Sequence, residues 1–90
     1  MSELIQEAKR LIHIGQTKEA IALLEQIGSK ETQDAVCYLK GNAYRREGNL
    51  QQAMEAYLEA MEINPDSPAT QAYQMARNIM EFRNKEMFNH

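Results

Sequence analysis

The sequence is poor in several residue types, and each shortage excludes a class of protein. It has a single cysteine, Cys37, among 90 residues, so the chain cannot form an internal disulfide. A lone thiol fits a reducing compartment. The N-terminal segment MSELIQEAKR has neither the basic start nor the long apolar core of a secretion signal. We therefore expect a cytoplasmic protein.

Long apolar stretches and an excess of positive charge are also missing. The longest apolar run, Ala20–Leu24, is far shorter than the roughly 20 residues needed to cross a bilayer. Ten Lys and Arg against 13 Asp and Glu give a net charge of −3, whereas a protein that binds phosphate backbones needs a basic surface. These features predict a chain that binds neither membranes nor nucleic acids.

What the sequence does contain is helical periodicity. Apolar residues recur at helical spacing, and capping and breaking residues divide the chain into five expected helices. Their ranges are about 3–13, 17–28, 33–47, 50–63 and 68 onward. Ser2 and Ser67 are expected N-caps, with Pro68 at a first helical position. The residues expected to face the core are Leu4, Ala8, Leu11, Ala20, Ile21, Leu23, Leu24, Ile27, Leu50, Ala53, Met54, Tyr57, Ala60, Met61, Ala72, Ala76 and Ile79.

Turn residues mark the connections between these helices. Gly15 and Gly28 are expected to end the first two helices, because glycine adopts the left-handed C-cap conformation at little cost. Gly48 followed by Asn49 turns the chain again, and Asn49 with Gln52 three residues later resembles a capping box. The run 64–66, Asn-Pro-Asp, is expected to end the fourth helix.

The chain also repeats itself. When it is shifted by 33 residues, residue sizes match at most key positions. Small residues fall on small ones at helix crossings, and large residues fall on large ones beside them. The matched pairs are Leu4 with Cys37, Ala8 with Gly41, Leu11 with Tyr44, Gly15 with Gly48, Ala20 with Ala53, and Leu24 with Tyr57. Such a period is the signature of a stacked repeat protein.

The second copy of the repeat carries a specific pattern. Between Asp34 and Pro65 stand, in order, Gly41, Tyr44, Gly48, Ala53, Tyr57, Ala60 and Pro65. In this pattern the chain resembles the tetratricopeptide repeat (TPR) family. The resemblance implies an all-α, right-handed α-solenoid of two helix hairpins plus a C-terminal capping helix, five helices in all. It implies one domain over 1–80, with repeats at about 1–32 and 34–67 and the capping helix from 68. The first repeat departs from the family pattern, with Thr32 near the closing proline and Ile27 at a small-residue position.

The end of the chain is expected to close the stack. Polar residues recur along the fifth helix at spacings of three and four, as a water-facing terminal repeat requires; they are Gln71, Gln74, Asn78, Glu81 and Lys85. Residues 81–90 are expected to continue the capping helix and form a tail. Its large apolar residues, Phe82, Met87 and Phe88, allow three interpretations: they fold back onto the core, pair with a second copy, or fray.

The resemblance also implies a binding surface. In this family, side chains of the first helix of each hairpin line a concave face that binds polypeptides. Carried over, those positions include Ile5, Ile12 and Met80, with His13 and Arg46 at the rim. The implied peptide-binding residues are Lys9, Tyr38, Asn42, Arg45, Tyr73 and Arg77.

The charge of this expected groove differs from that of the whole protein. Glu55, Glu59 and Glu62 share one face of the fourth helix, which leaves the groove basic. A basic groove favours acidic peptides or a free C-terminal carboxylate. Asn42 carries an amide that can bond a peptide backbone whatever its sequence. The alternative is that these Lys and Arg side chains are simply solvated.

One family ligand is not expected. Members that clamp chaperone tails place Lys and Asn on the first repeat and Lys and Arg on the third. The corresponding positions here hold Ile5 and Lys9, then Thr70 and Gln74, with Leu39 between, so this clamp is not reproduced.

The sequence offers few residues for catalysis or metal binding. No Ser/His/Asp set, phosphate-binding loop or acid pair can be assembled, and His13 and His90 have no second metal ligand at the usual spacing. Cys37 falls at a packing position and is expected to be a small buried hydrophobe. We expect no catalytic residue, no metal site and no cofactor.

Two functional hypotheses follow. The first is a non-enzymatic adaptor that binds a short, possibly acidic, peptide of another protein in its groove. The second is self-assembly into a homodimer through exposed terminal helices and the apolar tail. RNA binding is disfavoured because the chain is acidic and offers only two groove tyrosines for stacking.

Overall fold

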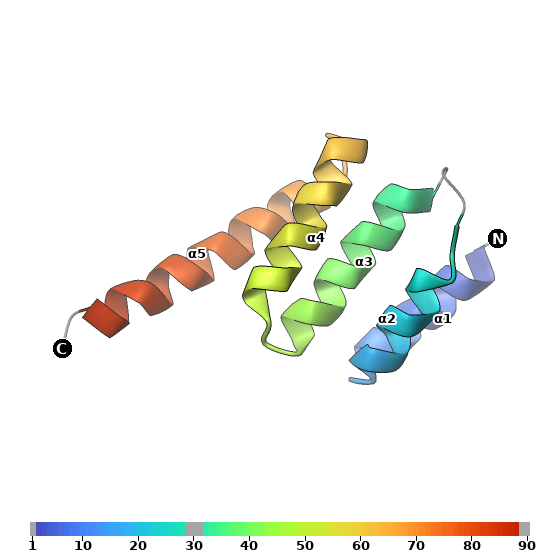
Figure 1. Cartoon of the computed structure of the whole chain (residues 1–90), viewed down its shortest axis with the longest axis horizontal. Coiled ribbons are helices and arrows are strands. Elements are labelled where there is room, and N and C mark those ends of the chain that lie inside the picture. The colour runs from blue at the N-terminus through green and yellow to red at the C-terminus, as the bar shows by residue number, and fades with distance from the viewer. Residues whose placement is uncertain (1, 29–31, 89–90) are drawn as a thin grey trace.

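Five α-helices make up the fold of the described chain. The computed structural model describes the backbone of residues 2–28 and 32–88, and the side chains of 3–28 and 32–83. In chain order the helices are α1 (Ser2–His13), α2 (Thr17–Glu25), α3 (Gln33–Arg46), α4 (Leu50–Ile63) and α5 (Ala69–Phe88). Each helix packs against the next, and the result measures 50 × 28 × 15 Å (Figure 1). The expected all-α fold with five sequential helices is confirmed.

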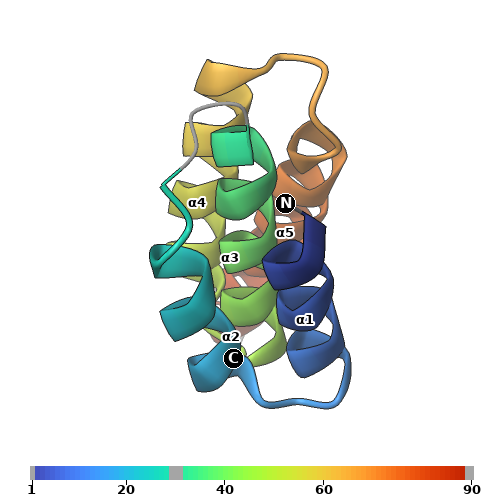
Figure 2. The same cartoon turned by 90° about the vertical axis from the view of Figure 1, so that its right-hand side faces the viewer.

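The helices are arranged so that α3 lies at the centre. Viewed along the stack, α2 and α4 lie on one side of α3, and α1 and α5 lie on the other (Figure 2). Both α1 and α5 pack against α3, but within the described residues they do not contact each other. The surface of α3 between them is therefore left open, and it forms the floor of a groove.

The two hairpins turn the chain in the same way. Gly15 and Gly48 have φ values of 88° and 87°, a left-handed conformation that glycine adopts readily. The N–H of the residue after each glycine bonds back five residues, from Gln16 to the carbonyl of Leu11 at 2.8 Å and from Asn49 to that of Tyr44 at 2.9 Å. This is the Schellman C-cap, and its recurrence 33 residues later confirms the predicted period at these turns.

The core is built from small residues at crossings and large ones beside them. Ala8, Ala20 and Ala53 have no exposed surface, and the largest fully buried side chains are Leu24 and Tyr57. A Cβ added to Gly41 would collide with the ring of Tyr57, reaching its Cζ at 2.9 Å. The small-and-large pattern predicted from the sequence is thus the packing pattern of the hairpins.

Local signals set the limits of α4 and α5. Asn49 accepts a bond from the N–H of Gln52 at 3.3 Å, as an N-cap does. Asn64 is extended (φ −143°, ψ 101°), as expected before proline, and α4 ends at Ile63. The buried Ser67 hydroxyl accepts from the N–H of Ala69 at 3.1 Å, which confirms its predicted capping role.

Several helix-level predictions were wrong. α2 ends at Glu25, not at Gly28, because the N–H groups of Gln26 and Ile27 bond three residues back, to Leu23 and Leu24 at 3.1 Å, and so close the last turn early. Leu4 is 45% exposed, since α1 packs only against α2 and α3 among the described helices.

The remaining differences concern packing at the edges of helices. Met54 and Met61 are half-buried, and so are Ile21, Leu23 and Ile27, because each lies on the flank of its apolar face. Ile79 is 39% exposed on α5. The predicted N-cap Ser2 lies inside α1, and its side chain is outside the described residues.

The end of the chain continues α5 through Phe88. Gln71, Gln74, Asn78 and Glu81 are exposed, as the polar stripe predicted, while the side chain of Lys85 lies outside the described part. Phe82 is 65% exposed, so it does not close the core. The side chains of Met87 and Phe88, and residues 89–90, are also outside the described part.

Candidate functional site

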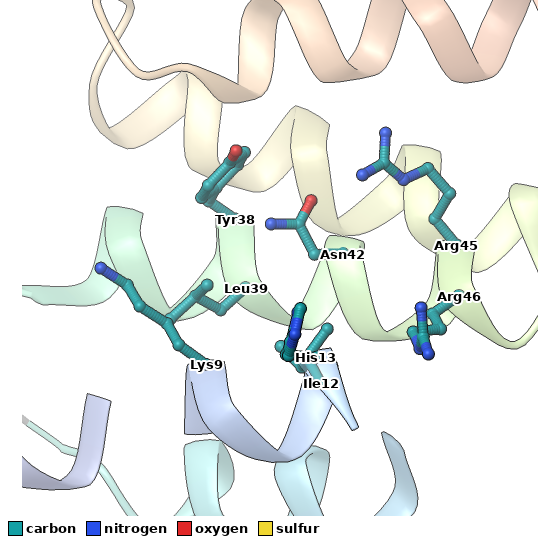
Figure 3. Close-up of a pocket in the computed structure, with 8 residues that line it drawn as sticks. All are labelled: Lys9, Ile12, His13, Tyr38, Leu39, Asn42, Arg45 and Arg46. Atoms are coloured by element: carbon teal, nitrogen blue, oxygen red, sulfur yellow. The ribbon is translucent and has the colours of Figure 1, made fainter. Parts of the chain in front are cut away.

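A hollow of about 640 Å³ lies over α1 and α3. Its lining comes from the last turns of α1 and from one face of α3 (Figure 3). Tyr38, Asn42 and Arg45 extend from α3 to the same side, and Lys9 approaches from α1. The described residues that line it are Lys9, Ile12, His13, Tyr38, Leu39, Asn42, Arg45 and Arg46. We call this hollow the α1–α3 groove.

The lining of the α1–α3 groove is basic. Four of its eight described residues, Lys9, His13, Arg45 and Arg46, are basic, and none is acidic. Two other arginines are paired, Arg10 with Glu7 and Arg77 with Glu81. Among the described side chains, no acid forms an ion pair with Lys9, Arg45 or Arg46. The groove thus presents positive charge that the described part of the chain does not neutralise.

Asn42 occupies the middle of this surface and is held in one orientation. The Tyr57 hydroxyl donates to Asn42 Oδ1 at 2.6 Å, across the α3–α4 hairpin. Burial raises the pKa of Tyr57 to about 12, so the phenol keeps its proton at neutral pH and remains a donor. Because Oδ1 is engaged, the amide nitrogen of Asn42 is the group left to donate into the groove.

Tyr38 forms one end of the groove. It is half-buried, it packs against both core clusters, and its ring centroid lies 6.0 Å from that of Tyr57 at an angle of 39°. Such tilted aromatic pairs fix ring orientation. Tyr38 and Asn42 are therefore both anchored by Tyr57, a residue fully buried behind the groove floor.

Comparison with known proteins gives two matches. A family model described as "Tetratricopeptide repeat" matches residues 35–67. The solution NMR structure of Bacteroides fragilis protein BF1650 matches 99% of this chain and 91% of its own, at 42% identity and a TM-score of 0.86. None of the curated protein sequences compared with this chain matches it.

The chain belongs to the tetratricopeptide repeat family. TPR domains are in general protein–protein interaction modules and are typically non-catalytic. The match over residues 35–67 covers α3 from its third residue, all of α4 and the turn that follows. Tyr38, Asn42 and Arg45 lie within it. Three of the predicted groove residues therefore lie in the part of the chain with the clearest TPR pattern.

The structure brings four of the six predicted groove residues together and leaves two apart. Lys9, Tyr38, Asn42 and Arg45 all line the α1–α3 groove. Tyr73 is half-buried against the core shared by α4 and α5. Arg77 is exposed, and its Nε lies 3.1 Å from Glu81 one turn along α5. Neither lines this hollow.

The structure also adds residues to the groove of this TPR domain. His13 and Arg46, expected at the rim, are part of the lining, and buried Leu39 contributes to its floor. The Arg46 guanidinium lies over the α1–α2 turn, where a Cβ on Gly15 would be 3.6 Å from it. Only the folded turn reveals this placement, because Gly15 and Arg46 are distant in sequence.

Other chemistry-bearing residues of the TPR domain lie away from the groove. Cys37 is buried (7% exposed), with its Sγ 3.6 Å from Glu59 Oε2. Burial, followed by the nearby Glu59 carboxylate, raises the pKa of the thiol and keeps it protonated.

Within the described residues, no group of three or more His, Cys, Asp or Glu could hold a metal ion, and no helix is long and apolar enough to span a bilayer.

Proposed function

We propose that this TPR protein is a non-enzymatic binding module that holds a short acidic peptide segment of another protein in the α1–α3 groove. The observation that carries the proposal is the charge of the lining: its described residues include the cations Lys9, Arg45 and Arg46 and no acid, in a chain whose net charge is −3. A concave surface of one sign concentrates ligands of the opposite sign. The acids Glu55, Glu59 and Glu62 are exposed on α4 and do not line the groove.

Each groove residue has a distinct part in this binding. Lys9 is exposed and Arg45 is half-buried, and both cations attract the carboxylates of the peptide. Asn42 donates from its amide nitrogen to a backbone carbonyl, since Tyr57 fixes its other end. Tyr38 supplies an apolar ring with a polar tip at the end of the groove. This surface is smaller than the ~800 Å² per partner of a standard interface, so we expect affinity on the order of micromolar.

The proposal is tested with a labelled peptide that carries charge but no large apolar residue. The fluorescence anisotropy of labelled Glu-Ser-Glu-Ser-Glu-Ser-Glu should rise when the protein is added. The affinity should fall as the salt concentration rises, because salt screens the attraction between opposite charges. Lys9→Glu and Arg45→Glu should each weaken binding about tenfold, which is a loss of about 1.4 kcal/mol. Asn42→Ala should weaken it about threefold to tenfold by removing one neutral hydrogen bond.

The matched control is Lys18→Glu, which makes the same charge change on exposed α2, outside the lining. It should leave the affinity within about twofold, because screened surface charges act weakly at a distance. If Lys18→Glu weakened binding as much as Lys9→Glu, the attraction would be a property of total charge, and the groove would not be the site.

Self-assembly is the second candidate, and it is favoured by apolar side chains exposed at both ends of the stack. Leu4 on α1 is 45% exposed, and Met75 and Phe82 on α5 are 54% and 65% exposed. Light scattering over a hundredfold concentration range decides this alternative. A mass that rises toward that of two chains supports a homodimer, and a constant monomer mass excludes it.

A further inference from the structure

An apolar stripe runs along α5 on surface that the described helices leave uncovered. Met75, Ile79 and Phe82 are 54%, 39% and 65% exposed. Their spacings of four and three residues place them on one side of the helix. From its first to its last residue the stripe spans seven helical steps, or about 10 Å at 1.5 Å per residue. We call these three residues the α5 stripe.

The repeat period shows which side of α5 the stripe occupies. Val36 and Leu39 of α3 pack in one core cluster with Ala8 and Leu24 of the preceding hairpin, and Ala43, one turn further along α3, is also buried. The residues 33 positions later, Ala69, Ala72 and Ala76, are buried as well. The period therefore extends into α5. Applied to the groove face of α3, the same shift takes Asn42 to Met75 and Arg46 to Ile79. The α5 stripe thus continues the groove face of α3.

The opposite flank of α5 has a different character. Tyr73 and Met80 are half-buried against the core cluster that α5 shares with α4. Arg77 is paired with Glu81, and Gln74 donates to Asn78 at 3.1 Å. These pairs satisfy the polar groups along that flank and the outer surface. Among the described side chains of α5, the large exposed apolar ones are therefore those of the α5 stripe.

The concave surface consequently has two unlike walls. Lys9 and His13 line the groove on the α1 side, and the repeat period puts the α5 stripe on the α5 side. Both α1 and α5 pack against α3, which lies between them as the floor (Figure 2). Successive side chains of an extended peptide point to opposite sides. A peptide lying along α3 would present every second residue to the basic wall and the others to the apolar wall.

We propose that the ligand of this groove is an extended peptide in which acidic and large apolar residues alternate. This inference rests on the proposed function and adds the apolar half of the ligand. At about 3.3 Å per extended residue, the 10 Å stripe spans roughly three residues, enough for two apolar side chains at alternate positions. The acids between them face the cations of α1 and α3.

A second copy of the chain is a poorer occupant of the stripe. Three side chains on one helix expose far less than the roughly 800 Å² that each partner buries in a standard dimer. The stripe is also continuous with a basic surface, and a second copy would bring its own cations to the same place. Charge complementarity therefore favours an acidic partner.

The test compares three labelled peptides of matched length and charge. The first is Glu-Ser-Glu-Ser-Glu-Ser-Glu, which tests the proposed function alone. The second, Glu-Leu-Glu-Phe-Glu-Leu-Glu, adds apolar residues at alternate positions. The third, Leu-Phe-Leu-Glu-Glu-Glu-Glu, has the same composition without alternation. We expect the second peptide to bind about tenfold more tightly than the first (about 1.4 kcal/mol) and more tightly than the third.

Two variants assign the gain to the stripe. Met75→Gln with Phe82→Asn should remove the advantage of the second peptide and leave the first peptide unaffected. The matched control is Leu58→Gln, which changes a side chain 41% exposed on α4 and should leave both affinities unchanged. Circular dichroism of each variant checks that the helices remain intact.

The outcomes separate the two proposals. Equal binding of the first and second peptides, or a gain that survives in the stripe double variant, overturns the apolar half and leaves the acidic groove standing. Binding of no peptide overturns the proposed function itself. A dimer in light scattering that becomes a monomer in the stripe double variant assigns the stripe to a second copy and also overturns this inference.

Discussion

At the scale of single residues, Gly41 marks a close approach of α3 to α4. It lies on α3 with its Cα facing Tyr57 of α4, and a Cβ there would approach the Tyr57 ring to 2.9 Å at Cζ and nearer at the adjacent ring carbons. The ring is fully buried and its hydroxyl is bonded to Asn42, so it has little freedom to move. The close approach of α3 and α4 therefore depends on the missing side chain.

We expect overpacking in Gly41→Ala to destabilise the protein by about 1–3 kcal/mol. The higher helix propensity of alanine offsets up to about 1 kcal/mol of this loss. Gly41→Leu should prevent folding. The measurement is urea unfolding followed by circular dichroism. Gly28→Ala is the control, because a Cβ at Gly28 meets no atom of the described residues within 4 Å, and its effect should stay within about 0.5 kcal/mol. A Gly41→Ala variant as stable as the parent would contradict this account of the packing.

Residue identity also explains how far the site could be predicted. Lys9, Tyr38, Asn42 and Arg45 came together in the groove because the 33-residue period fixes which face of α1 and α3 they share. The prediction of Tyr73 and Arg77 required the repeat register to be extended into α5. Among the described residues, α5 has no following helix with which it forms a hairpin. There one residue of shift turns the helix by about 100°, enough to exchange one flank for another.

At the scale of elements, the helix ends with strong local signals were predictable and the others were not. The α1 and α3 ends carry Gly15 and Gly48, and the end of α4 carries Asn64 before Pro65, so sequence and structure agree there. The end of α2 carries no such residue at Glu25. Its position is set by backbone hydrogen bonds that tighten the final turn. No residue type in the sequence predicts these bonds.

The start of α5 offers a test of one such signal. Replacing Ser67 by alanine removes the hydroxyl that accepts from Ala69 N–H and leaves that buried donor without its partner. We expect a loss of about 1 kcal/mol in unfolding free energy, whereas Ser67→Gly should cost only a few tenths. Amide hydrogen exchange at Ala69 and Thr70 should accelerate in Ser67→Ala before the exchange of α3 amides changes. A Ser67→Ala variant as stable as the parent, with unchanged exchange at Ala69, would show that the hydroxyl does not act as the cap.

At the scale of the whole molecule, the hairpin and the groove share one support. Tyr57 fills the crossing at Gly41, makes a tilted ring contact with Tyr38 and orients Asn42, so a single buried residue links packing to the groove surface. Sequence periodicity predicted that Tyr57 would be buried. It did not predict the bond to Asn42, because that bond depends on the distance between two helices rather than on spacing along one.

The same residue makes the stability of the whole molecule sensitive to alkaline pH. Burial raises the pKa of Tyr57 to about 12 in the folded protein, against about 10 in an unfolded chain. Because the folded pKa is the higher one, its contribution to stability is fully present below pH 10 and is lost as pH rises toward 12. Between pH 9 and pH 11 the free energy of unfolding should fall by about 1 kcal/mol on this account.

Tyr57→Phe isolates this contribution from the other titrating groups. The variant cannot ionise at this position. Between pH 9 and pH 11 its free energy of unfolding should therefore fall by about 1 kcal/mol less than that of the parent. Loss of the hydrogen bond to Asn42 lowers its stability equally at both pH values and does not affect this difference. Tyr44→Phe is the matched control, because Tyr44 is only half-buried, and it should decline with pH in parallel with the parent. If Tyr57→Phe and the parent declined in parallel instead, the phenol would titrate as it does in water, and the dry contact between α3 and α4 on which the groove floor rests would be refuted.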